Sequence, residues 1–455
     1  MNRIVKVFGT VLILMLVVLP VFSAETEKPF DMGMSLVIGT QSFNENGQTV
    51  TYQKLSFNPD ISFGKVGIGL NITLHYNFTG GANGNEFEIR KADWVPDPVT
   101  FQNILGLYLP LIRYVRYGEK GDPIYAKFGQ IDDATLGNGF IMGNYSNTLF
   151  LPEQRIFGLS FDMDGSLFNF PYVGFESVVG NLALFDVIGM RFYVRPLLFL
   201  SVPIIKNIEF GTTIAADTNV FAHEPDYATS LGINAEEAKI TAYGMDFRLP
   251  LLSNPVVSLA TFGDIASIQG KSVGGMLGFG GKLISFFTYG AQLRMLGQDF
   301  IPVYFDASYD LFRTLKYQLI EAGGSIPPFV GWFASLGTSF LDDKIIFNVS
   351  LDGPFGVVDN DPNNYMNYPH LRGIFEIAED ILPGFSFDAS YDKKMIASFS
   401  DLISPEDAVI QARLNYKTGP AMISFIYKIK YVPNAGSGEN PWEITSGLES
   451  SIQLF

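Results

Sequence analysis

Apolar and polar residues alternate along much of the chain. From Val66 to Phe78 every second residue is large and apolar, and the residues between them are glycine, polar or histidine. The same period of two recurs at 385–391 and 408–418. Successive side chains of a β-strand point to opposite faces of the sheet. Each of these segments therefore predicts a strand with one apolar and one polar face.

Two architectures use such two-faced strands. In a secreted β-sandwich the apolar faces pack together, and in a membrane β-barrel they contact lipid. The runs 66–78 and 408–418 are long enough to cross a bilayer, which takes roughly 9–11 tilted residues, whereas ordinary strands average about 5–6. Tyr76, Tyr416 and Tyr431 lie near strand ends, where barrels carry aromatic girdles. We expect an all-β fold, a single transmembrane antiparallel β-barrel, and keep the soluble sandwich as the alternative.

Candidate strands follow one another through the whole chain. We place them at 33–41, 51–57, 66–78, 104–117, 124–130, 155–163, 172–179, 187–198, 208–215, 240–249, 256–263, 274–286, 288–296, 301–309, 330–341, 344–352, 369–377, 385–391, 408–418, 421–432 and 442–455. This set is odd, whereas a single-chain bacterial barrel has an even number of strands. The segment 310–321 is ambiguous, because its leucines fit either a helix or a strand. We predict about 20 strands, within a range of roughly 18–22.

Short and long connections alternate in much of the chain. The short ones include 253–255, 342–343 and 418–420, and the long polar ones are 79–103, 131–154, 216–239, 354–368 and 392–406. Bacterial barrels have short periplasmic turns and longer extracellular loops. We therefore expect the long connections to face outward.

The N-terminus has the three parts of a secretory signal peptide. Arg3 and Lys6 precede an apolar run at 11–21, and small residues follow at Ser23 and Ala24. We predict a signal peptide at 1–24 and the barrel at 25–455, with no room for an N-terminal plug domain. Later in the chain, no uninterrupted apolar run reaches the roughly 18–20 residues of a membrane helix.

The chain ends in an aromatic residue, Phe455. A signal peptide, serial amphipathic strands and this terminal Phe together resemble porin-like β-barrels of the bacterial outer membrane. The resemblance implies Sec-type export, residence in outer-membrane lipid and recognition of the last strand by the outer-membrane assembly machinery. The sequence departs from the family pattern at its end, because Leu448, Ile452 and Leu454 share one face and Phe455 falls on the other.

Composition narrows the classes of function. Charged residues make up 17% of the chain, against about 25% in soluble domains. The formal net charge of −16 disfavours a nucleic-acid partner, whose phosphates are also negative. The count of cysteines is 0, which excludes disulfides and thiolate chemistry.

Candidate chemistry is sparse. His75, His223 and His370 have no companion at metal-ligand spacing, so we expect no enzyme activity, cofactor or metal site. Asp162, Asp164 and Gly165 fit a hairpin turn better than a calcium loop. The oxygen-rich stretch 359–364 is expected to be a solvated loop, with weak calcium binding as the alternative.

Inward-facing strand positions carry polar groups of both charge signs. The candidate lumen-lining residues are Asn71, His75, Asn77, Arg191, Arg195, Asp388, Asp392, Arg413, Lys417, Lys428 and Lys430. Opposed charges across a lumen orient dipolar solutes in diffusion pores. Cross-strand ion pairs that fill the wall are an equally good reading.

These patterns predict an outer-membrane channel for passive diffusion of small hydrophilic solutes or ions, narrowed by a loop. Overall acidity suggests a mild cation preference. One alternative is a structural or anchoring barrel whose long loops bind a surface layer or polysaccharide, and a further one is a transporter of hydrophobic compounds. A homo-oligomer, such as a trimer, stays open. An inward-folded loop favours the pore, and a lumen packed with side chains favours the structural role.

Overall fold

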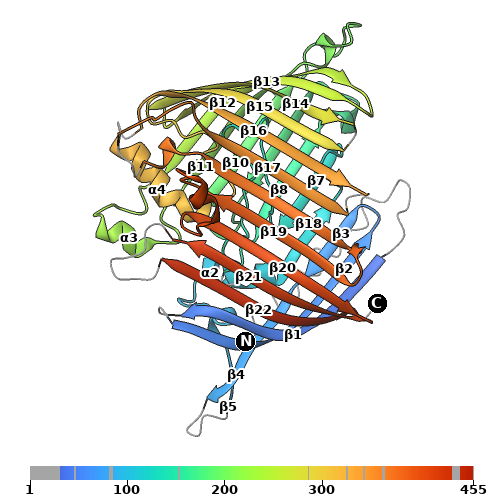
Figure 1. Ribbon diagram of the computed structural model, residues 1–455, viewed down its shortest axis with the longest axis vertical. Helices are drawn as coiled ribbons and strands as arrows, with labels where there is room; N and C mark the ends of the chain where they lie inside the picture. The colour runs from blue at the N-terminus through green and yellow to red at the C-terminus, as the bar shows by residue number, and fades with distance from the viewer. Residues whose placement is uncertain are drawn as a thin grey trace.

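The computed structural model describes residues 31–45, 48–80, 86–151, 154–284, 286–323, 326–341, 344–360, 364–432 and 441–453. The predicted signal peptide, the turn at 342–343, part of the 359–364 loop and Phe455 lie outside these residues. All described strands join one antiparallel sheet. Its first strand pairs with its last, from Ser35↔Gln453 to Gln41↔Gly447, so the sheet closes on itself (Figure 1).

The barrel is built mostly from consecutive hairpins. Its strands are β1 (Asp31–Glu45), β2 (Gln48–Phe63), β3 (Val66–Leu70), β4 (Ile72–Gly80), β5 (Glu86–Ile89), β6 (Ile112–Tyr117), β7 (Ile124–Gly129), β8 (Gly158–Asp164), β9 (Val173–Val179), β10 (Val187–Val194), β11 (Glu209–Asp217), β12 (Ile240–Ser253), β13 (Ser258–Ile268), β14 (Ser272–Leu283), β15 (Phe287–Leu296), β16 (Phe329–Phe340), β17 (Ile345–Pro354), β18 (His370–Leu382), β19 (Phe385–Lys393), β20 (Ala408–Thr418), β21 (Ala421–Tyr431) and β22 (Trp442–Gln453). Most are long enough to cross a bilayer when tilted.

Two positions in the wall are shared by two elements each. β3 and β4 lie end to end against β2, separated by Asn71. β5 pairs with β4 and β6 pairs with β3, so these two occupy the next position with an insertion between them. With each pair counted as one strand, the wall is a closed barrel of 20 strands, which confirms the predicted fold class and strand number.

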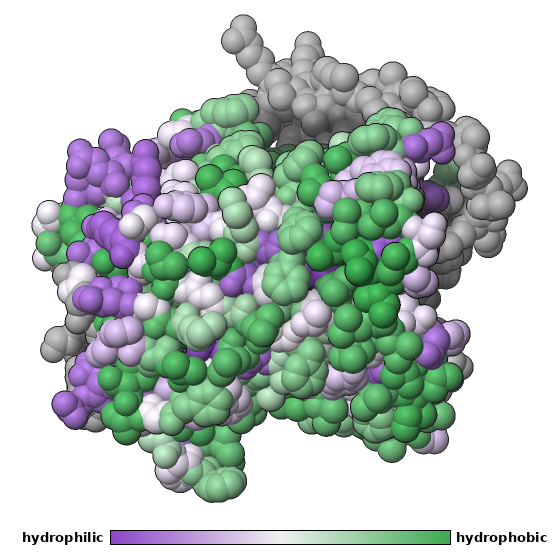
Figure 2. All heavy atoms as spheres, turned by 90° about the horizontal axis from the view of Figure 1, so that it is seen from above, coloured by the Kyte–Doolittle hydropathy of each residue, from purple (hydrophilic) through white to green (hydrophobic). Residues whose placement is uncertain are grey.

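The alternation of the sequence separates the outside of the wall from the inside. On β10, Met190 and Phe192 are exposed outward, whereas Arg191 and Tyr193 are buried inside. Figure 2 shows hydrophobic side chains covering most of one face of the molecule, with a group of hydrophilic ones at the left edge. An apolar exterior around a closed wall is the arrangement of a transmembrane barrel and excludes the sandwich.

The helices lie in the connections. They are α2 (Phe101–Tyr108), α3 (Pro225–Ser230) and α4 (Tyr309–Ala322), with 3₁₀ turns η2 (Lys91–Asp93), η3 (Leu109–Leu111), η4 (Gly165–Phe168), η5 (Ile205–Asn207), η6 (Tyr365–Asn367) and η7 (Phe399–Ile403). Within the described residues, none of the helices is long and apolar enough to span a membrane.

The ambiguous segment 310–321 is helical. Leu311, Leu315 and Leu319 recur every four residues, as one face of a helix requires, and Gly323 ends α4 with a φ of 64°. The surplus strand was instead 301–309, which is a loop. The predicted strand at 104–117 is also wrong in its first part, which is occupied by α2 and η3.

The connections differ between the two ends of the barrel. At the end that holds both termini, several turns are tight, such as 64–65, 383–384 and 419–420. Long connections at the opposite end include 130–157, 218–239, 297–328, 355–369 and 394–407, and Figure 1 shows α3 and α4 there. The prediction missed the 297–328 connection. The connection after β7 lies at this end, as predicted, and its residues 131–149 fold into the barrel, where Phe140, Met142 and Tyr145 are buried.

Candidate functional site: a plugged lumen with cavities along its wall

Two connections fill part of the lumen. We call residues 131–149 together with 297–326 the lumen plug. The two segments are joined by backbone hydrogen bonds, in which the amide of Val303 donates to the carbonyl of Phe140 (2.8 Å) and that of Phe305 to Ile141 (3.1 Å). The Phe140 and Phe300 rings stack with centroids 5.3 Å apart. Because each segment buries the apolar side chains of the other, the two form one packed unit.

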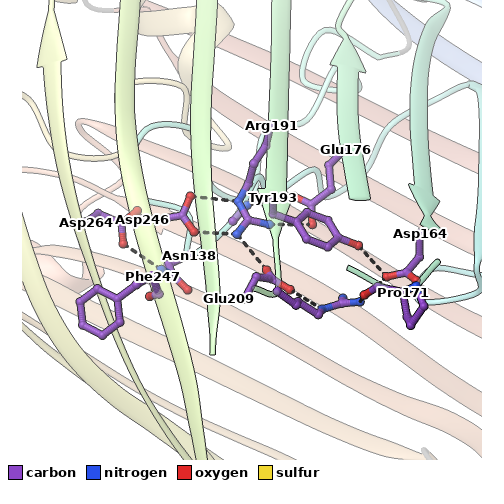
Figure 3. A network of polar contacts seen from close by, with 12 residues as sticks. Asn138, Asp164, Pro171, Glu176, Arg191, Tyr193, Glu209, Asp246, Phe247 and Asp264 are labelled. Atoms are coloured by element: carbon purple, nitrogen blue, oxygen red, sulfur yellow. Dashed lines mark hydrogen bonds and ion pairs between the residues drawn. The ribbon is translucent and has the colours of Figure 1, made fainter. Parts of the chain in front are cut away.

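The tip of the plug touches the wall at an ionic cluster on β9 to β13. The backbone amide of Gly137 donates to Glu176 (3.1 Å), and the Asn138 amide group donates to Asp264 (2.9 Å) (Figure 3). Gly137 has a φ of 57°, and a Cβ there would lie 2.8 Å from Nε of Arg191. Glycine therefore permits both the turn and the close approach.

Arg191 is the centre of this cluster. Its guanidinium donates to Asp246 (2.6 and 2.9 Å), to Glu209 (2.9 Å) and to Glu176 (3.3 Å). Arg195 donates to Asp164 (2.6 Å) and Glu209 (3.0 Å). Figure 3 shows these side chains forming a continuous band across neighbouring strands. Both predicted arginines thus point inward, but carboxylates occupy their donors and the plug covers part of them.

The trailing end of the plug is held by β21. The ammonium group of Lys428 donates to the carbonyls of Leu149 and Leu151. Lys430 pairs with Glu443 (2.6 Å) and stands over the Phe150 ring at 4.8 Å from its centroid. These two predicted lumen cations are therefore anchors for the loop, with their charges turned away from open solvent.

Helix α4 is clamped by a buried cluster around Arg313. The guanidinium donates to Asp217 (2.6 and 3.0 Å), to Asp186 (3.2 Å) and to the carbonyl of Asn219 (3.0 Å). Asp310, one helical turn earlier, lies 3.6 Å from the guanidinium. Burial raises the pKa of Asp310 to about 7, although Arg313 acts in the opposite direction. The cluster ties α4 to the start of β10 and the end of β11, at the end of the barrel opposite the termini.

A second charged group joins the plug to the connection after β19. Asp306 accepts from Lys316 (2.9 Å) and from Lys394 (3.0 Å). Burial would raise the pKa of Asp306, but the two ammonium groups hold it well below its usual range. Burial lowers the pKa of Lys316 to about 8, against the pull of Asp306. This group faces a cavity on the β15–β20 side.

Two cavities adjoin along that side of the wall. The first, of about 100 Å³, lies between Asn144, Val303 and Asp306 of the plug and the strands β15 to β19. The second, of about 270 Å³, lies deeper between residues 132–149 and the strands β18 to β20. They share Ala307, Arg372 and Asp392 in their linings. The two cavities therefore adjoin along the inner wall, and we refer to them together as the path.

Charged side chains of both signs line this path. His370 lies between Asp352 (3.2 Å) and Asp392 (3.1 Å), and Arg294 pairs with Asp352 (3.1 Å). Arg372 lies at the junction of the cavities, and its guanidinium has no hydrogen bond or ion pair to any residue that the structure describes. Its donors are accordingly available to a solute.

Deeper in the path the wall is acidic. Glu376 and Asp388 stand opposite one another in the β18–β19 register, and Asp388 also stands opposite Arg413 on β20. Lys417, nearer the terminal end, pairs with Glu379 (2.9 Å) at an exposed position. The predicted residues Asp388, Asp392, Arg413 and Lys417 thus lie on one inner sector, of which the first two line the cavities.

The three N-terminal candidates lie elsewhere. Nδ1 of His75 is 2.7 Å from Asp93, whose segment covers the inner face of β4. Asn71 interrupts the strand, and its amide donates to the carbonyl of Leu111 (2.8 Å). Asn77 stands opposite Glu88 in the register. A third cavity, of about 390 Å³, separates residues 92–111 from residues 154–157, with Thr73 of β4 in its lining.

Across the described ranges, no three His, Asp or Glu residues are grouped in a way that could hold a metal ion. Burial lowers the pKa of His223 to about 3, and its ring packs 4.7 Å from that of Phe150. His223 is thus a neutral packing residue at ordinary pH.

Sequence reasoning missed the second half of the plug. Ile301, Val303 and Phe305 alternate with other residues as a lipid-facing strand does, but Ile301 and Phe305 are buried inside the barrel and Val303 lines the first cavity. The available signal was the helical spacing of the leucines that follow. The residues from 301 and the helix α4 both lie between β15 and β16, so together they form one long connection.

Comparisons with known proteins add no closer identity. No protein-family model matches the chain, and no curated protein matches it in sequence. Solved structures that align with it include OprD from Pseudomonas aeruginosa, with 12% identity, a TM-score of 0.35 and 93% of each chain covered. OccK11 (OpdR) from the same organism gives 12% identity and a TM-score of 0.35 over 94% of this chain and 96% of that one. CdiB from Acinetobacter baumannii gives 6% identity and a TM-score of 0.28 over 93% of this chain, which spans 60% of CdiB. Because these identities and TM-scores are low, the description of the fold rests on the strand pairing of the barrel itself.

Proposed function

We propose that this porin-like barrel is a passive channel for small hydrophilic solutes across the bacterial outer membrane. The protein would reach that membrane by Sec-type export. The observation that carries the proposal is the polar path of two adjoining cavities between the lumen plug and the β15–β20 wall. A 20-strand wall encloses more space than side chains alone can fill. The plug narrows that space without packing against every strand.

The size of the path limits what it can admit. Cavities of about 100 and 270 Å³ are smaller than the pockets of roughly 300–1,000 Å³ that hold one drug-sized ligand. Only ions and small solutes would pass, in single file and in contact with wall and plug. Larger polymers would be excluded by the fixed position of the plug.

The charges along the path predict its ion preference. Carboxylates outnumber the Lys and Arg side chains in the combined lining. The former are Asp132, Asp306, Asp352, Glu376, Asp388 and Asp392, and the latter are Arg294, Lys316, Arg372 and Lys394. Fixed charges in a narrow aqueous path act strongly on passing ions, because the wall excludes bulk screening. We expect a mild preference for cations over anions.

A structural or anchoring barrel is the second candidate. The observation that favours it is the dry core of the plug, in which Phe140, Met142, Phe300 and Phe305 are all buried. In a structural barrel, bracing the wall would be the only role of this core. The two candidates differ in whether water and ions cross the protein.

Planar-bilayer recording distinguishes them. We expect the purified protein to give stable conductance steps, with a reversal potential in a potassium chloride gradient of the sign for cation preference. Arg372→Gln removes an unpaired cation from the path and should increase this preference. Lys271→Gln is the control, because Lys271 pairs with Glu321 at an exposed position away from the cavities. Folded, inserted protein that conducts no current would overturn the channel and favour the structural role.

A further inference from the structure

The connection between β19 and β20 lies partly on the outer side of the barrel wall. Tyr391 is on the outward face of β19, two pleats beyond Phe387, and its hydroxyl donates to the carbonyl of Leu402 (2.8 Å). Lys393 follows on the same face, and its ammonium group donates to the carbonyl of Glu406. Two outward side chains thus hold residues 394–407 against the outside of the wall.

This connection presents large apolar side chains to its surroundings. In η7, Phe399 is 92% exposed and Ile403 is 87% exposed. The carboxylate of Asp401 between them is folded back, accepting from the amides of Ala397 (2.9 Å) and Ser398 (2.7 Å). The most prominent groups of the turn are therefore apolar, even though the turn is also built from serine and aspartate.

The neighbouring connection after β17 continues the apolar surface. Phe355 is 66% exposed and Val357 is 81% exposed, just beyond the end of β17 at Pro354. The amide of Phe355 donates to the carbonyl of Val330, another outward residue (3.0 Å). The two connections are joined where the amide of Ile396 donates to the carbonyl of Pro369 (3.2 Å).

We infer that Val330, Phe355, Val357, Phe399 and Ile403 form an apolar rim that inserts into the outer leaflet of the bilayer. The occupant is lipid because the rim lies at one end of the outward face of β16 to β20, along which Leu336, Phe347 and Leu414 are exposed toward the membrane. Contiguous exposed apolar groups of this kind mark an interaction surface. Aromatic and aliphatic side chains at strand ends suit the boundary between acyl chains and headgroups.

The rim connects the lipid to the solute path. Lys394, immediately after the outward Lys393, turns inward and pairs with Asp306 of the plug. One short segment thus contacts the membrane on one side and lines the first cavity on the other. This coupling rests on the proposed channel, whereas lipid contact by the rim does not.

Single-cysteine labelling tests the rim, because the native chain contains 0 cysteines. Phe399→Cys and Ile403→Cys carry a nitroxide label in protein reconstituted into bilayers. Ser400→Cys is the matched control in the same turn, and Leu414→Cys marks the lipid-facing wall. We expect labels at 399 and 403 to be relaxed by oxygen and protected from a water-soluble nickel chelate, as at 414, with the opposite at 400. Folding is checked in each variant by circular dichroism.

Two results would overturn the inference. Equal accessibility to the chelate at 399, 400 and 403 would show that the turn stands in water. Line broadening between labels at 399 that disappears when labelled protein is diluted with unlabelled protein would show that a second copy covers the rim. Neither result bears on ion conductance, so failure of the rim and failure of the channel are separable.

Discussion

Replacing Arg313 by methionine should release helix α4 from the wall. The guanidinium is buried and makes hydrogen bonds to Asp186, Asp217 and the carbonyl of Asn219. Methionine retains much of the volume but leaves the carboxylates facing one another without their cation. Removing one partner of a buried ion pair costs about 3–5 kcal/mol. At about 1.4 kcal/mol per power of ten, the equilibrium for local opening of α4 should shift by roughly two to three and a half powers of ten.

Hydrogen–deuterium exchange of the α4 amides measures this shift directly, since protected amides exchange through local opening. Lys271→Met is the matched control, because it removes the exposed Lys271–Glu321 pair (2.9 Å) at the other end of the same helix. Such surface pairs contribute about 0–1 kcal/mol, so exchange should change little.

The combined variant R313M/D186N/D217N should regain much of the protection, because the carboxylates no longer repel. Unchanged α4 exchange in Arg313→Met, with the barrel folded, would refute the clamp.

Three further changes probe the plug and the path. Lys428→Met leaves the carbonyls of Leu149 and Leu151 without their donor, at a cost of about 1–3 kcal/mol, and should increase current noise in bilayer recordings, whereas Lys417→Met should not. Asp310→Asn tests pH dependence. The pKa of Asp310 is about 7 in the folded protein against the usual 3.8, so between these values the folded protein holds a proton that the unfolded chain has lost. Protection of the α4 amides should therefore rise as the pH falls from about 7 to 4 in the native protein, and stay flat in the variant. Glu376→Gln removes an acid from the second cavity and should shift the reversal potential toward anions; a shift toward cations would contradict the proposed path.

The barrel wall was predictable because each strand meets two different environments. Lipid outside and polar groups inside impose a period of two, which local sequence displays directly, as at 66–78 and 408–418. The same alternation gave the inward orientation of Arg191, Lys428 and Asp388. Strand number required the hairpin count to be even, and the helix at 310–321 was one of the two readings of its leucines.

The plug was not predictable, because its contacts join distant parts of the chain. Residue 303 pairs with residue 140, and Lys428 reaches a carbonyl 277 positions earlier. Nothing near Lys428 in sequence distinguishes an anchor from a free lumen cation. The apolar residues of 301–309 carry the period of a strand whether they face lipid or the partner loop, so only the three-dimensional pairing decides between them.

The lumen plug is attached at Asn138 to β13, through Arg313 to the ends of β10 and β11, and through Leu149 to β21. A closed wall of 20 hydrogen-bonded strands can change between a round and a flattened cross-section without breaking any backbone hydrogen bond. Contacts between the plug and widely separated strands prevent this change. The plug thus fixes the cross-section of the barrel. The width of the path along β15–β20 is then determined by these contacts between the plug and other strands of the wall. Substitutions at those distant fastenings should change conductance even though no permeating solute touches them.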